Sequence, residues 1–302
     1  MSEAAPAPLG TVAHYTLLER LEPAGPGELY RARDTHRGRT VAVRLLPSGF
    51  AADPAALIAN ARSLIALSHP NAIALFDVGD HGGRVFLVFE FLTGQSLRAE
   101  MAGRSLNVRR AVDLAVQMTD AVADAHAAGF IHGGLSPDSI VVTAKGHAKI
   151  PAFELAAHGG FEQANGEVRL RDYDSPEEAR GERPDERSDV FSVGAILYEM
   201  LTARRPHHRG AAAPSASNPH VPKELDEAVL TAVAPNPANR HQSAAAFAAA
   251  LRSVAAMIDA RGGLDDEEDE QPAPSAGATR VLVTAALILA AVALIAWWVM
   301  RS

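Results

Sequence analysis

Two kinds of residue that often bind metals, cysteine and histidine, give no candidate metal site in this sequence. Cysteine is absent, which excludes disulfides, thiolate metal sites and cysteine nucleophiles. The pair His207–His208 and the single His158 have no carboxylate at a spacing suited to a shared ion. We interpret them as exposed loop residues and predict no metal site.

The net negative charge of the chain argues against one class of partner, the nucleic acids. The chain has 302 residues and a formal net charge of −8, and it contains no long basic stripe, so nucleic-acid binding is not expected. The beginning of the chain, MSEAAPAP, lacks a basic stretch followed by an apolar core, so we expect no secretory signal.

The hydrophobic pattern predicts an α+β architecture with two lobes. Residues 1–13 are small and polar and are expected to be disordered. From Tyr15 to Leu92 the sequence alternates short strand-like runs, interrupted by one helix from about Asp53 to Leu67. From Ser105 onward, apolar residues recur at helical spacing, and residues 188–201 are apolar nearly all round. We expect that run to be a buried central helix with Ser188 or Asp189 near its N-cap. A last helix should stop at Gly262–Gly263.

The C-terminal sequence predicts a membrane anchor. Residues 261–279 form an acidic linker rich in Pro, Ala and Ser. Residues 281–300 carry no charge and lie between Arg280 and Arg301. Such a helix spans about 30 Å, enough for the hydrocarbon core of a bilayer. We favour a single-pass transmembrane helix over 280–301 rather than a buried core helix. The globular region is then expected on the cytoplasmic side of the cytoplasmic membrane, with the C-terminus outside.

Several motifs, taken in order, identify a family. They are PAGPGELYRARDT, TVAVRLL, SHPNAIALFDVGD, VFLVFEFLTGQSL, AHAAGFIHGGLSPDSIVV, AKIPAFELA, YDSPEEARGERPDERSDVFSVGAILYEML and NPANR. Together they resemble the bacterial serine/threonine protein kinases over about residues 15–255. The resemblance implies a protein-kinase-like domain at 14–260, with an N-lobe at about 14–93 and a C-lobe at about 94–260.

The resemblance also implies that the phosphate-binding residues of the N-lobe have changed. The three positions that resemble the glycine-rich loop hold Glu22, Ala24 and Gly27. Arg44 stands where the family has its ATP-binding lysine, and Asn60 aligns with the glutamate that would pair with that lysine. Lysine occurs only outside this lobe, at positions 145, 149 and 223, so we expect no local substitute.

The catalytic positions implied by the resemblance have changed as well. Gly134 replaces the catalytic aspartate, Ser136 the lysine that contacts phosphate, and Ser139 the metal-binding asparagine. Ala152 replaces the metal-binding aspartate of the DFG-like triplet. Asp138 and Glu154 could substitute for the lost carboxylates, but we interpret both as surface charges.

Residues that resemble structural parts of the fold are kept. The resemblance implies that Glu177 pairs with Arg240, that Asp189 accepts hydrogen bonds from the catalytic-loop backbone, and that three apolar residues stack between the lobes: Leu64, His132 and Phe153. Leu29, Ala42 and Val141 resemble the walls of an adenine pocket. We favour core packing over nucleotide binding for these three, so no cofactor is predicted, although metal-independent ATP binding stays open.

The sequence therefore predicts a pseudokinase that is not an enzyme. It would act as a membrane-tethered binding or regulatory module in bacterial Ser/Thr kinase-type signalling. Its protein partner would be an active kinase, a phosphopeptide-reading domain or an envelope-building enzyme. Two alternatives stay open: a divergent active kinase or nucleotide-binding transferase that uses non-standard residues, and an inert degenerate paralogue.

Overall fold

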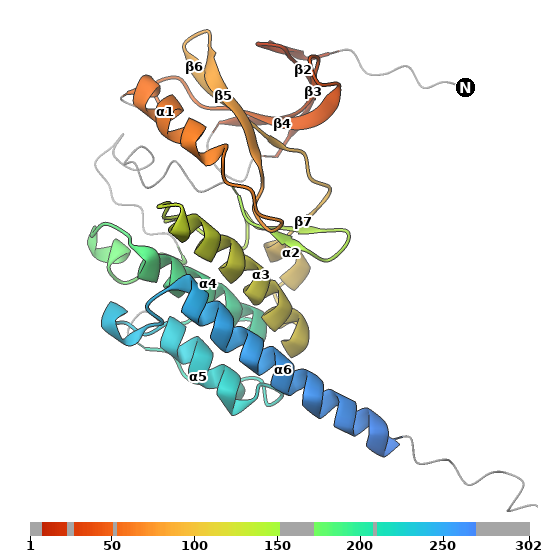
Figure 1. Cartoon of the computed structure of the whole chain (residues 1–302), viewed down its shortest axis with the longest axis vertical. Helices are drawn as coiled ribbons and strands as arrows, with labels where there is room; N and C mark the ends of the chain where they lie inside the picture. The colour runs from red at the N-terminus through yellow and green to blue at the C-terminus, as the bar shows by residue number, and fades with distance from the viewer. Residues whose placement is uncertain (1–7, 23–26, 51–52, 152–171, 208–209, 270–302) are drawn as a thin grey trace, which may run out of the picture. The chain divides into compact units, whose positions relative to one another are not determined.

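The structure is a computed structural model that describes residues 8–22, 27–50, 53–151, 172–207 and 210–269, with side chains described as far as Arg261 (Figure 1). The chain divides into two compact units, residues 1–255 and 256–302. The first unit holds both predicted lobes. The described part of the second unit is the C-terminal portion of helix α6 (Ala244–Asp269).

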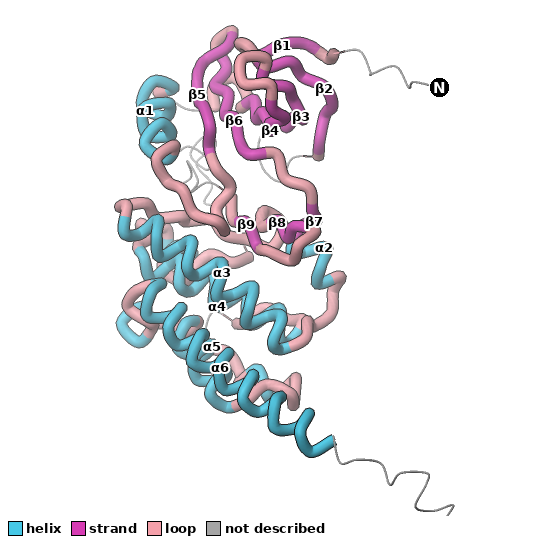
Figure 2. Tube along the Cα trace, turned by 45° about the vertical axis from the view of Figure 1, so that its right-hand side comes forward, coloured by secondary structure: helices cyan, strands magenta, loops and turns pink. Residues whose placement is uncertain are grey.

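The N-lobe is built on a six-stranded antiparallel sheet of order β1-β2-β3-β4-β6-β5 (Figures 1 and 2). Its strands are β1 (Gly10–Val12), β2 (Tyr15–Leu21), β3 (Glu28–Asp34), β4 (Arg39–Leu45), β5 (Leu75–His81) and β6 (Arg84–Glu90). Successive side chains of a strand alternate between the two faces of a sheet. Val41 and Val43 of β4 are accordingly buried in the core with Val88, while Ala42 and Arg44 belong to the other face.

Helix α1 (Pro54–Leu64) is the one helix among the described residues of the N-lobe, and it lies beside β5 (Figure 1). Its start is fixed by Asp53, whose carboxylate accepts a hydrogen bond from the Ala56 N–H at 3.0 Å, and by Pro54 in the first turn. Leu57, Ala61 and Leu64 are its buried residues. This three- and four-residue spacing places them on a single face.

The C-lobe is mainly helical. Its elements are α2 (Leu97–Met101), α3 (Val108–Ala127), α4 (Glu186–Thr202), α5 (Lys223–Ala232) and the first part of α6. A small antiparallel sheet, β7 (Gly94–Ser96), β8 (Val141–Thr143) and β9 (Ala148–Lys149), lies above α3 in Figure 2. Short 3-10 helices occur at Glu178–Arg180, Pro214–Ala216 and Pro237–Asn239. The predicted two-lobed α+β fold is confirmed.

Helix α4 is the buried centre of the C-lobe, as the sequence predicts. A Cβ added at Gly194 would lie 2.6 Å from the Ala232 Cβ, so glycine permits the close packing of α4 and α5. Ser188 and Asp189 lie near the N-cap, as predicted, and the structure identifies the cap residue itself. Asp185 is the N-cap, and it forms a capping box with Ser188, so Ser188 and Asp189 lie inside the first turn.

Two boundaries differ from those predicted. Gly10–Val12 form strand β1, paired with β2, where the sequence predicts disorder through residue 13. Helix α6 continues to Asp269, past Gly262–Gly263, where the sequence predicts a linker. Within the described ranges no helix is both long and apolar enough to cross a membrane. Residues 280–301 lie outside those ranges, so the anchor stays a prediction.

Candidate functional site

A pocket of about 310 Å³ opens between the two lobes. Residues from β2, β3, β4, α1, β5 and β6 line it on the N-lobe side, and residues from β7, β8 and the loop before β8 line it on the C-lobe side. It contains three of the predicted site residues that were assigned to an adenine pocket: Leu29, Ala42 and Val141.

Strand register explains why the N-lobe residues share this pocket. Ala42 lies opposite Phe89 of β6, and Arg44 lies between Leu29 of β3 and Leu87 of β6. Residues directly opposite each other in antiparallel strands point to the same face of the sheet. On the N-lobe side, the pocket is therefore lined by the apolar side chains of Leu29, Ala42, Leu87 and Phe89, and Arg44 lines the same side.

Helix α1 contributes apolar residues to the pocket rather than a charge. Ala61 and Leu64 line it. Asn60, which precedes them, is not among the lining residues; its backbone carbonyl accepts a hydrogen bond from the Ser63 hydroxyl at 2.6 Å. Of the two positions that resemble the lysine–glutamate pair, the pocket lining includes Arg44 but not Asn60.

Lys149 of β9 contacts a residue of the pocket lining, which was not predicted. Its ammonium donates to the Glu90 carboxylate at 2.9 Å and to the Ala72 carbonyl at 3.3 Å. Glu90 lines the pocket. The sequence predicts no lysine near the N-lobe, because Lys149 lies far along the chain from β6. The antiparallel pairing of β9 with β8 carries it there, and no local sequence signal reveals this.

The pocket floor carries Asp138 and Ser139. Asp138 is exposed and pairs with Arg98 at 3.4 Å, and Arg98 in turn donates to Glu199 at 2.7 Å and to the Tyr173 hydroxyl. The Ser139 hydroxyl donates to the Ser136 carbonyl at 3.0 Å, and the Ser136 hydroxyl lies 3.4 Å from that of Ser139. The hydrogen bonds of the two serine hydroxyls are therefore made within a single turn of the chain.

The loop at residues 132–134 is held by its backbone. The buried carboxylate of Asp189 accepts hydrogen bonds from the His132 N–H at 2.7 Å and the Gly133 N–H at 2.8 Å. The ring of His126 lies 2.8 Å from the same carboxylate. Gly133 has φ +61°, and the fully buried His132 precedes it. Gly134 follows directly in this loop.

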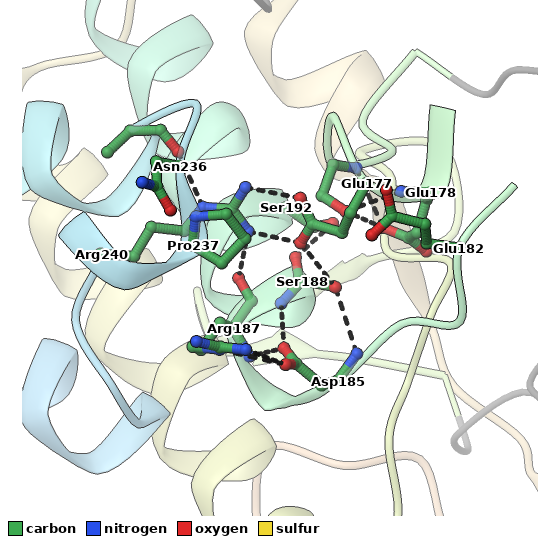
Figure 3. A network of polar contacts seen from close by, with 12 residues as sticks. Glu177, Glu178, Glu182, Asp185, Arg187, Ser188, Ser192, Asn236, Pro237 and Arg240 are labelled. Carbon is green, nitrogen blue, oxygen red and sulfur yellow. Dashed lines mark hydrogen bonds and ion pairs between the residues drawn. The ribbon is translucent and has the colours of Figure 1, made fainter. Parts of the chain in front are cut away.

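The buried pair Glu177–Arg240 lies deeper in the C-lobe (Figure 3). The Arg240 guanidinium donates to the two carboxylate oxygens at 2.6 and 2.7 Å, and the Ser188 hydroxyl donates to Glu177 at 2.8 Å. Burial raises the pKa of Glu177, but the hydrogen bonds from Arg240 outweigh that effect and bring the pKa down to about 2. The Glu177 carboxylate is therefore ionised in the folded protein at neutral pH.

Some predicted site residues lie outside the described residues: Ala24, Ala152, Phe153 and Glu154. Leu64 and His132, the other two members of the predicted apolar stack, are both buried. Within the described part of the chain, no three His, Asp or Glu side chains gather as metal ligands would.

Residues 17–251 match the model of the protein kinase domain family, so the chain belongs to that family. One relative is the probable serine/threonine-protein kinase SCO3848 of Streptomyces coelicolor, which is 34% identical over 76% of this chain and 38% of that protein. Another is the serine/threonine-protein kinase PknB of Mycolicibacterium smegmatis, which is 33% identical over 80% of this chain and 43% of that protein. PknA of Mycobacterium tuberculosis is 31% identical over 80% of this chain and 61% of its own length.

Solved structures agree on the fold. The PknI kinase domain of M. tuberculosis, as a cysteine-to-alanine mutant, superposes with a TM-score of 0.67 at 23% identity, covering 84% of this chain and 99% of that one. The chain spans about two-fifths of the length of SCO3848 and PknB, at 38% and 43%.

These comparisons correct one prediction. The sequence predicts that the chain is not an enzyme, because the residues at the catalytic positions differ from the family pattern. The family model is that of the protein kinase domain, and the relatives are named serine/threonine kinases. The prediction of a non-enzyme is therefore wrong, and pseudokinase status is not shown.

Proposed function

We propose that the chain is a divergent, nucleotide-binding member of the serine/threonine protein kinase signalling family. Its inter-lobe pocket would take an adenine-type ligand, and its surface would engage a protein partner. The observation that carries the proposal is the position of Leu29, Ala42 and Val141, which line one pocket of about 310 Å³ from opposite lobes.

The chemistry of the pocket supports a flat, apolar ligand. Small-molecule sites are mainly apolar concavities of about 300–1,000 Å³ with a few polar groups. Here the N-lobe side is mainly aliphatic and aromatic, and Val141 lies on the opposite lobe. The methyl group of Ala42 leaves room for a ring where a larger side chain would fill the space. An open pocket favours ligand binding over the core packing expected from the sequence.

The role in signalling is proposed from the relatives and the predicted anchor. A segment at 280–301 that crossed the cytoplasmic membrane would keep the kinase-family domain on the cytoplasmic side and raise its effective concentration near membrane partners. The partner classes proposed are an active kinase, a phosphopeptide-reading domain and an envelope-building enzyme.

Ligand binding can be tested by thermal unfolding with adenine compounds. A ligand present at a hundred times its Kd stabilises the folded state by about 2.7 kcal/mol. Ala42→Phe places a ring inside the pocket and should abolish that stabilisation. Ala55→Phe is the matched control, since Ala55 is an exposed residue of α1. The proposal is overturned if no adenine compound stabilises the parent protein.

A further inference from the structure

The protein kinase family uses ATP together with Mg²⁺. Mg²⁺ prefers carboxylate oxygens in addition to those of the phosphates. On the pocket floor, Ser139 is a neutral hydroxyl that already donates to the Ser136 carbonyl at 3.0 Å. The neighbouring carboxylate of Asp138 is paired with Arg98 at 3.4 Å. These residues do not fit the metal.

The charges around the pocket do not favour a triphosphate either. Three of the described lining residues are acidic, namely Glu22, Glu90 and Asp138, and Arg44 is the one lysine or arginine among those described. Lys149 and Arg98 compensate Glu90 and Asp138. A pair of opposite charges has little net charge with which to attract an anion. Glu22, which directly follows β2, would repel phosphates that enter the pocket beneath the sheet.

The remaining attraction of the pocket is therefore for the flat base. The lining is dominated by aliphatic and aromatic residues, and its volume of about 310 Å³ lies at the lower limit of typical small-molecule sites. Burying apolar rings is favourable regardless of the charge that the ligand carries elsewhere.

We infer that this pocket selects the nucleoside part of its ligand, and that neither the phosphates nor Mg²⁺ add affinity. The ligand class is adenosine and its phosphorylated forms, bound without a metal. This inference rests on the proposed function, because it concerns the same pocket, and it departs from the magnesium nucleotide that the family uses.

The test is titration calorimetry of the full chain in detergent with adenosine, AMP, ADP and ATP, each with EDTA and with excess Mg²⁺. We expect the Kd of ATP to be no tighter than that of adenosine beyond about threefold, equivalent to about 0.6 kcal/mol. Added Mg²⁺ should leave each Kd unchanged within the same margin. Glu22→Gln should tighten ATP binding relative to adenosine, whereas the control Glu182→Gln, at an exposed carboxylate outside the pocket, should not.

The two proposals fail in different ways. ATP binding more than about threefold tighter than adenosine, with or without Mg²⁺, would overturn the nucleoside inference and leave the proposed nucleotide site standing. Absence of binding by all four compounds, with the parent and Ala42→Phe indistinguishable, would overturn both. Similar Kd values across the series, lost in Ala42→Phe and kept in Ala55→Phe, would support both.

Discussion

The Arg240 guanidinium binds both oxygens of the Glu177 carboxylate, at 2.6 and 2.7 Å, in a part of the C-lobe where both side chains are almost fully buried. Arg240 also donates to the carbonyls of Ala234 and Arg187, at 2.8 and 2.9 Å. One guanidinium therefore joins the segment before α4, the start of α4 and the segment before α6 (Figure 3).

Arg240→Ala should destabilise the domain by about 3–5 kcal/mol, because the Glu177 carboxylate would stay buried without its partner. Urea unfolding followed by circular dichroism measures the change. Arg252→Ala is the matched control, since Arg252 is an exposed arginine paired with Asp120. Equal unfolding midpoints for the two variants would show that the buried pair does not stabilise the fold.

The same pair predicts a loss of stability in acid. The pKa of Glu177 is about 2 in the folded protein against an ordinary value of 4.5. A depressed folded-state pKa contributes stability that is fully present above pH 4.5 and is lost as pH falls from there toward 2. The contribution is about 3 kcal/mol at neutral pH, since each pKa unit is about 1.4 kcal/mol.

Urea unfolding from pH 7 to pH 2.5 measures this dependence. Glu177→Gln should be less stable than the parent at pH 7 and should lose less stability on acidification. Glu182→Gln, which changes an exposed carboxylate, should follow the parent profile. Parallel profiles for the parent and Glu177→Gln would contradict the assignment.

Asp189→Asn should loosen the loop at residues 132–134. The asparagine side chain has one acceptor oxygen and places an N–H donor toward backbone N–H donors that the carboxylate now satisfies. Leaving a buried donor unsatisfied costs about 1–3 kcal/mol. Hydrogen exchange of the His132 and Gly133 amides should accelerate, whereas Asp120→Asn should leave these amides protected. Unchanged exchange in Asp189→Asn would contradict the prediction.

The Lys149–Glu90 contact should show measurable coupling. A double-mutant cycle with Lys149→Met and Glu90→Gln is expected to give an interaction free energy of about 0.5–1 kcal/mol, because the pair is only partly buried. Raising the salt concentration should reduce it. A coupling of zero at low salt would show that the two side chains do not stabilise each other.

The predicted anchor can be tested by truncation after Asp269, which keeps all of α6 and removes residues 270–302. The shortened protein should move from the membrane fraction to the soluble fraction of disrupted cells. In intact cells, the full-length domain should resist protease added outside. Truncated protein that stayed with the membrane would contradict the anchor, and external digestion would contradict the proposed orientation.

The order of the two lobes could be predicted because the spacing of hydrophobic residues changes from two to three or four near Leu92. In the structure, the register of β3, β4 and β6 brings Leu29, Ala42 and Leu87 to one face of the sheet. Lys149 was missed, because a contact between β9 and β6 depends on how the chain folds back. Asp185 was missed as the N-cap, because Asp185, Ser188 and Asp189 are all good capping residues, and only the backbone geometry selects among them.

Asp189 grips the loop at residues 132–134 through main-chain N–H groups. These two contacts use no side chain of the loop itself. The shape of this stretch of backbone is therefore encoded 56 and 57 residues further along the chain, at a residue of α4, rather than at Gly134 itself.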